Sequence, residues 1–90
     1  METQTYKRAK DVSWQEMGGK GILISIENSM THELNHTALE IWKYLEDGKT
    51  ATQVEEHLAN KYSISIEAVR EDVANCLNTF QDQSLLEVNE

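Results

Sequence analysis

Proline is absent from the sequence, cysteine occurs once, and no long apolar run is present. Because Cys76 has no second cysteine to pair with, an intrachain disulfide framework is excluded, which suits a reducing compartment. A membrane span would need roughly 20 apolar residues in a row. The polar start, Met1 to Lys10, also lacks the apolar stretch of a signal peptide. We therefore expect a cytoplasmic protein that does not act at a membrane.

Basic residues are also scarce, since 8 Lys and Arg stand against 16 Asp and Glu, for a formal net charge of −8. Residues 1–30 are balanced, so the whole net charge falls on residues 31–90. Such a surface repels phosphate backbones and favours basic or neutral partners. Nucleic acid is therefore not an expected partner.

The length of the chain bounds its organisation. With 90 residues, of which 39% are hydrophobic, the chain can build one small core but not two. No linker, low-complexity tract or internal repeat interrupts it. The sequence thus predicts a single domain over residues 1–90, with its core at about residues 12–88. The segment Met1 to Lys10 offers only Tyr6 and Ala9 as apolar surface, so we expect it to be mobile or weakly docked.

The first third of the chain follows the two-residue period of β-strands. Val12 to Met17 alternates loosely, and the glycine-rich Gly18 to Gly21 forms a hairpin turn. A second, half-buried strand then places three isoleucines on one face: Ile22, Ile24 and Ile26. Met30 to Leu34 forms a short third strand, which completes an antiparallel meander.

After Leu34 the period becomes helical, and a capping residue precedes each of three predicted helices. The caps are Asn35, Thr50 with Gln53 as its capping-box partner, and Ser65. The expected buried faces are Ala38, Ile41, Trp42 and Leu45, then Val54, Leu58 and Tyr62, then Ile66, Val69, Val73, Leu77 and Phe80. Ser84 to Val88 is either a closing strand or a docked segment. The predicted fold class is α+β, a three-stranded antiparallel sheet followed by three helices, similar to a winged helix-turn-helix.

The residues His32-Glu33-Leu34-Asn35-His36 match the H-E-x-x-H pattern of zinc hydrolases. That motif works only on a helix, where both imidazoles share a face and the glutamate reaches a zinc-bound water. Here the strand-to-helix boundary falls inside the motif, so His32 and His36 do not share a face. His57 is the one remaining histidine that could act as a third ligand. We therefore expect solvated polar residues and no metal site.

The other candidate catalytic residues have simpler structural explanations. Cys76 flanks the buried stripe of the third helix, as a small semi-buried apolar residue would. Gly18 to Gly21 lacks the Gly-Lys-Ser/Thr ending of a phosphate loop and precedes a strand. Trp14 and Trp42 are expected core anchors. The sequence thus predicts a protein that is not an enzyme and uses no cofactor.

A winged helix-turn-helix fold introduces a DNA-binding regulator as an alternative, with the third helix in the major groove. From Ser65 to Asp82 this helix carries Arg70 alone against four carboxylates. Each phosphate would then meet uncompensated negative charge. The alternative stays open, and the charge of the helix argues against it.

The residues at the sheet-to-helix boundary resemble those of a known family. Leu34-Asn35-x-Thr37-Ala38-x-x-Ile41-Trp42-x-x-Leu45, followed by Asp47-Gly48 and Thr50, looks like the core of the PqqD-like proteins. The resemblance continues through Val54-x-x-x-Leu58-x-x-x-Tyr62 and Val69-x-x-Asp72-Val73-x-x-x-Leu77, and covers about residues 12–88. The chain departs from the family at Ser84, where a glycine usually precedes the final leucine-rich segment.

This resemblance implies a non-catalytic chaperone that binds the leader of a ribosomally synthesised, modified peptide (RiPP). The chaperone presents the leader to a radical SAM enzyme, a leader peptidase or a cyclase. Family members bind the leader as an added strand on the third strand, in a groove shared with the third helix. An edge strand with unpaired N–H and C=O groups suits that role. The expected peptide-binding residues are Met30, Thr31, His32, Glu33, Arg70, Val73, Ala74 and Leu77.

Two pathways fit a stand-alone domain of this type: lasso-peptide biosynthesis and pyrroloquinoline quinone biosynthesis. The segment before Leu34, Asn28 to Glu33, lacks the Pro-Glu-Gly sequence associated with the quinone-pathway members. The resemblance therefore favours a lasso-peptide or related RiPP system, with the quinone pathway as the alternative.

Overall fold

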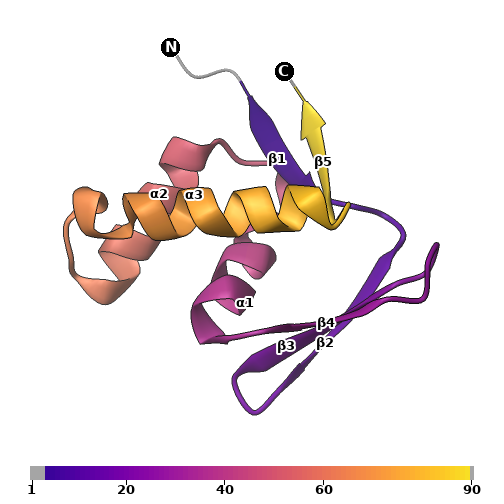
Figure 1. The fold of residues 1–90 in the computed structure, drawn as a ribbon. Helices are drawn as coiled ribbons and strands as arrows, with labels where there is room; N and C mark the ends of the chain where they lie inside the picture. Colours follow the sequence, from indigo (N-terminus) through magenta and orange to yellow (C-terminus); the bar gives the residue numbers. More distant parts are fainter. Residues whose placement is uncertain (1–3, 90) are drawn as a thin grey trace.

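A three-stranded antiparallel sheet followed by three α-helices forms the body of the protein, and a computed structural model describes residues 4–89 (Figure 1). The elements are β1 (Thr5–Arg8), β2 (Val12–Met17), β3 (Lys20–Ser25), β4 (Thr31–Leu34), α1 (His36–Tyr44), the 3-10 helix η1 (Leu45–Asp47), α2 (Ala51–Tyr62), α3 (Ile66–Asp82) and β5 (Leu86–Asn89). The sheet has the order β2-β3-β4, and α1 contacts both the sheet and α2. The predicted α+β fold class is confirmed. Among residues 4–89, no helix has the length and apolar character needed to cross a membrane.

A two-stranded ribbon of β1 and β5 corrects the expectation for the N-terminal segment. β1 runs antiparallel to β5, with Thr5 opposite Asn89 (Figure 1). The backbone of Tyr6 also exchanges hydrogen bonds of 2.8 and 2.9 Å with Lys49, and its side chain packs on the core. The prediction of a mobile or weakly docked segment over Met1 to Lys10 is therefore wrong for β1, while residues 1–3 lie outside the described residues. The closing-strand alternative for the C-terminal segment is confirmed.

Arg8 connects this ribbon to the sheet and to the core. Its guanidinium carbon lies 5.3 Å from the ring centroid of Trp14 and 5.7 Å from that of Trp42, and it donates to Glu46 at 3.0 Å. Trp42 is fully buried, as predicted, whereas Trp14 is 36% exposed, so its prediction as a core anchor is wrong. Trp14 lies on the outer strand β2, where its electron-rich ring attracts the Arg8 cation.

The hairpin between β2 and β3 is confirmed, but the strand after it buries an unexpected face. Gly18 and Gly19 have φ values of +60° and +81°, which a tight two-residue turn requires. In β3 the side chains of Leu23 and Ser25 are buried, while Ile24 is exposed. Gly21 allows this orientation, because a Cβ atom there would lie only 2.8 Å from Cδ1 of Leu39. Helix α1 therefore packs against the glycine face rather than the isoleucine face.

The helices pack around Trp42, whose ring meets that of Phe80 edge-on at a centroid distance of 5.7 Å. The predicted caps at Asn35, Thr50 and Ser65 all form, including the capping box of Thr50. Tyr62 is exposed, so its prediction as a buried residue is wrong, because it ends α2 beyond the packed turns. The sequence pattern also did not indicate Leu39, which is buried. The buried core comprises Leu23, Leu34, Leu39, Ile41, Trp42, Leu45, Val54, Leu58, Ala59, Val69, Val73, Leu77, Phe80 and Leu85.

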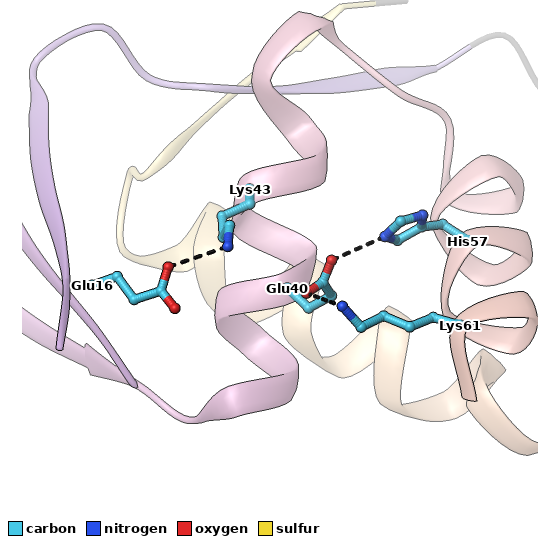
Figure 2. Close-up of polar contacts among 5 residues, drawn as sticks. All are labelled: Glu16, Glu40, Lys43, His57 and Lys61. Carbon is cyan, nitrogen blue, oxygen red and sulfur yellow. Dashed lines mark hydrogen bonds and ion pairs between the residues drawn. The ribbon is translucent and has the colours of Figure 1, made fainter. Parts of the chain in front are cut away.

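Two ion-pair systems leave α1 in opposite directions (Figure 2). Lys43 donates to Glu16 of β2 at 3.2 Å. On the other side, Glu40 accepts from Lys61 at 2.8 Å and lies 3.1 Å from Nε2 of His57, both in α2 (Figure 2). The Lys61 ammonium lowers the pKa of Glu40 below its usual value of 4.5; burial opposes this, and the hydrogen bond with His57 reinforces it. These contacts fix α1 between the sheet and α2.

Replacing Glu40 by glutamine should destabilise the protein at about pH 7, by about 0.5–1 kcal/mol for a half-buried pair. Because the folded-state pKa is lowered, the carboxylate stabilises the fold above its unfolded-state pKa. That contribution disappears as the pH falls through the lowered folded-state pKa. Urea denaturation of both proteins at about pH 7 and about pH 3 measures the difference. Glu56→Gln, at an exposed site in α2, is the control and should change little, and an equal loss for Glu40→Gln at both pH values would contradict this account.

The junction between α3 and β5 contains Ser84, the residue at which the chain departs from the pattern that it resembles. Ser84 has φ of +59°, the left-handed conformation that glycine adopts most easily. The N–H of Leu85 donates to the carbonyl of Phe80 at 2.9 Å, and that of Ser84 donates to Gln81 at 3.0 Å. This is the Schellman pattern of helix ends, with Leu85 and Phe80 in the expected apolar positions. A turn that favours glycine thus forms here with serine.

Ser84→Gly should raise the stability of the protein by up to about 1 kcal/mol, because it removes the Cβ strain of a left-handed residue. The greater freedom of glycine in the unfolded chain offsets part of this gain. Ser84→Ala is the matched control, since it loses the hydroxyl but keeps the Cβ, and should give no gain. Thermal unfolding of the three proteins measures the effect. An equal rise for alanine and glycine would show that the hydroxyl, not the backbone, is the source.

Candidate functional site

In the described part of the chain, β4 is an edge strand, and its register with β3 shows which backbone groups face outward. The N–H of Ser25 donates to the carbonyl of Met30 at 2.9 Å, so these residues form a hydrogen-bonded pair. Such pairs alternate along an antiparallel ladder, so His32 also bonds to β3. The N–H and C=O groups of Thr31 and Glu33 therefore point away from the sheet. They form an open edge with which an extended peptide can pair as an additional strand.

A groove of about 470 Å³ lies beside this edge, between β4, α1 and α3. The buried Leu34, Ile41 and Phe80 form its floor. Exposed polar residues surround this floor: Glu33, Asn35, Thr37, Asp72, Asn75 and Thr79. An open strand edge beside an apolar floor combines backbone hydrogen bonding with a pocket for side chains.

The strand residues predicted for the site lie at or beside this edge. Thr31 and Glu33 are exposed and share a face, while His32 points to the other face of the sheet. Nε2 of His32 is buried and has no hydrogen-bond partner among the described residues. Met30 directly precedes β4 and is exposed. The structure thus brings Glu33 to the groove and places Thr31 farther along the same edge.

The helix residues predicted for the site do not line the groove. Val73 and Leu77 are buried core residues beneath it. Nε of Arg70 lies 3.6 Å from Oε1 of Glu55 in α2. Ala74 follows one turn later on the same flank of α3. The opposite flank contributes to the groove instead.

Besides Phe80, the groove side of α3 has four residues that the sequence analysis did not predict as peptide-binding. They are Asp72, Asn75, Cys76 and Thr79, spaced so that they share one helical face. The sequence does indicate them in part, because these polar or small residues form a stripe next to the buried stripe of the helix. An equally spaced stripe lies on the other flank, so the spacing alone does not choose between them.

Cys76 lies in this groove, and its chemistry matches the semi-buried apolar role predicted for it. Burial raises the pKa of the Cys76 thiol to about 12. The thiol is therefore neutral at physiological pH, whereas a nucleophilic cysteine needs the thiolate. Cys76 contributes shape and apolar surface to the groove.

The H-E-x-x-H match is split between two elements, as predicted. β4 ends at Leu34 and α1 begins at His36, so His32 and His36 lie on a strand and a helix respectively. His57 pairs with Glu40 on the α2 side of α1. Within residues 4–89, no three His, Cys, Asp or Glu side chains gather into a group suited to a metal ion.

Three solved structures are similar to this chain in fold. The structure described as TbiB1 in complex with the TbiA(beta) leader peptide is 22% identical, with a TM-score of 0.81, over 90% of this chain and 94% of that chain. Lasso peptide synthetase B1 complexed with the leader peptide is 18% identical, with a TM-score of 0.77, over 91% and 96%. The PqqD truncation of Methylobacterium extorquens PqqCD, a stand-alone RiPP recognition element, is 19% identical, with a TM-score of 0.75, over 92% and 88%.

The family assignment comes from the sequence. None of the curated proteins matches the chain. A family model described as coenzyme PQQ synthesis protein D (PqqD) matches residues 20–86, which include β3, β4, all three helices and the start of β5. This match contains both sides of the groove and the motif at the sheet-to-helix boundary. The chain therefore belongs to the PqqD family.

Proposed function

We propose that this protein binds the leader of a ribosomally synthesised precursor peptide as an added strand along β4 and presents it to a modifying enzyme or leader peptidase. The observation that carries this proposal is the outward direction of the backbone groups of Thr31 and Glu33 beside an apolar groove. Two structures of the same fold hold leader peptides, which supports the same role here. Precursor peptides are made in the cytoplasm, and this protein would act there.

The proposed role is non-catalytic. The groove offers backbone hydrogen bonds, an apolar floor and a neutral thiol, all of which suit binding rather than bond cleavage. The family relative from Methylobacterium extorquens is described as a recognition element, which supports this role. Among RiPP pathways we favour a lasso-peptide system or a related one, because Asn28 to Glu33 lacks Pro-Glu-Gly and one of the similar structures is described as a lasso peptide synthetase B1. Pyrroloquinoline quinone biosynthesis is the alternative pathway.

The strength of the strand pairing indicates how much the groove must add. Thr31 and Glu33 together offer two N–H donors and two C=O acceptors, each hydrogen bond contributing about 0.5–1.5 kcal/mol net. Their sum, about 2–6 kcal/mol, is less than the binding free energy that corresponds to a micromolar dissociation constant. Side chains of the leader in the groove must therefore supply the remaining affinity and the specificity. Val73 and Leu77 would support the floor from below, while Arg70 and Ala74 would lie outside the contact.

Thr31→Pro should weaken leader binding at least about fivefold, because proline lacks the outward N–H and its ring obstructs the edge. The N–H of Thr31 does not bond to β3, so the sheet itself should persist. Thr31→Ala is the matched control, since it keeps the N–H and should bind nearly as the parent does. Titration calorimetry with a synthetic leader, taken from a precursor gene next to the gene of this protein, measures the affinities.

Arg70→Glu is a second control, placed on the α2 side of α3. Because the groove lies on the other flank, this change should leave leader affinity almost unchanged. Circular dichroism must show that every variant is folded. If folded Thr31→Pro bound like the parent, or if Arg70→Glu were the weaker variant, the leader would have to lie somewhere other than along β4.

A further inference from the structure

The charged residues around the groove are of one sign. Its lining contains two charged residues, Glu33 and Asp72, and both are acidic. The ammonium of Lys20 lies 3.9 Å from Glu33, so Glu33 has a cation nearby. Asp72 makes no ion pair or side-chain hydrogen bond within residues 4–89. The α3 side of the groove therefore carries one uncompensated negative charge.

Asp72 lies close to the apolar part of the groove. It shares the groove-facing stripe of α3 with Cys76, one turn later, and the buried Phe80 continues along the floor. The other polar residues of α3 at this rim, Asn75 and Thr79, are uncharged. A peptide that enters the groove thus meets the apolar surface of Cys76 one helical turn from the Asp72 carboxylate, and Phe80 one turn farther on.

The alternation of side chains along an added strand determines which of them face α3. Successive side chains of a strand point to opposite faces, so residues two apart share a face. A side chain that faces α3 and enters the apolar floor therefore has, two positions away, a neighbour that also faces α3. That neighbour passes Asp72, where a positive charge is favoured and a negative charge is repelled.

We infer that the leader recognised by this protein carries a lysine or arginine two positions from an apolar anchor, and that Asp72 selects this basic residue while the apolar floor beside Cys76 receives the anchor. This inference rests on the proposed function and defines the chemistry of the peptide. The excess of carboxylates in residues 31–90 adds to the attraction at longer range. A leader with an acidic residue at the same position would be excluded.

Selection from a phage-displayed library of random peptides tests this inference and does not require the natural leader. The library is panned separately on the parent protein and on Thr31→Pro, Asp72→Lys and Glu56→Lys. Glu56→Lys makes the same change of charge at an exposed site in α2, which contributes no residue to the groove. Peptides that bind the parent but not Thr31→Pro depend on the β4 edge.

Among these edge-dependent peptides, the parent and Glu56→Lys should enrich a basic residue two positions from an apolar one. Asp72→Lys should replace that preference with an acidic residue. A selected parent peptide should bind Asp72→Lys about threefold to tenfold more weakly at low salt, with a smaller difference at high salt.

The outcomes separate this inference from the proposed function. Edge-dependent peptides without a basic preference, or with one that Asp72→Lys leaves unchanged, would overturn the role of Asp72 and leave strand addition intact. A change of preference in Glu56→Lys as large as that in Asp72→Lys would reduce the effect to net charge and also overturn it. If no parent-selected peptide lost binding to Thr31→Pro, strand addition along β4 would fail, and the inference with it.

Discussion

The edge-on contact between the rings of Trp42 and Phe80 sets the spacing on which both the core and the groove depend. Trp42 is fully buried in α1, and Phe80 is buried in the last turns of α3, so their contact fixes the distance between these helices. Phe80 and Ile41, the neighbour of Trp42 in the chain, also form part of the groove floor. The floor of the groove is therefore part of the core. A change of side-chain volume at Trp42 would alter the peptide site as well as the stability of the fold.

Features that depend on neighbouring residues could be predicted from the sequence. Asn35, Thr50 and Ser65 each cap a helix through a hydrogen bond to a backbone group three residues later, so the helix starts could be identified from short segments. Gly18 and Gly19 likewise identify a tight turn. The predictions that failed concern features that depend on residues distant in the sequence. β1 forms because β5 is available at the other end of the described chain, and β3 buries Leu23 because Gly21 lets Leu39 approach.

The candidate site divides in the same way. The open edge of β4 follows from the order of three antiparallel strands, and that order could be predicted from the sequence. The groove side of α3 could not be predicted, because two stripes of equal spacing flank the buried one. Arg70 was the more conspicuous choice, since it is the one basic residue of the helix, but Glu55 of α2 lies beside it. Which stripe faces β4 depends on how α3 crosses the sheet and α1, and that crossing is a property of the whole packing.

The ribbon of β1 and β5 has a consequence for the order in which the protein folds. Pairing Thr5 with Asn89 closes a loop that contains almost the whole described chain, and the entropy cost of such a closure grows with the number of residues enclosed. The hairpins of the sheet and the contact of α2 with α3 enclose far shorter loops and should form earlier. During synthesis, Asn89 leaves the ribosome after every residue of the groove. The peptide site, which encloses shorter loops, can thus form before β1 pairs with β5.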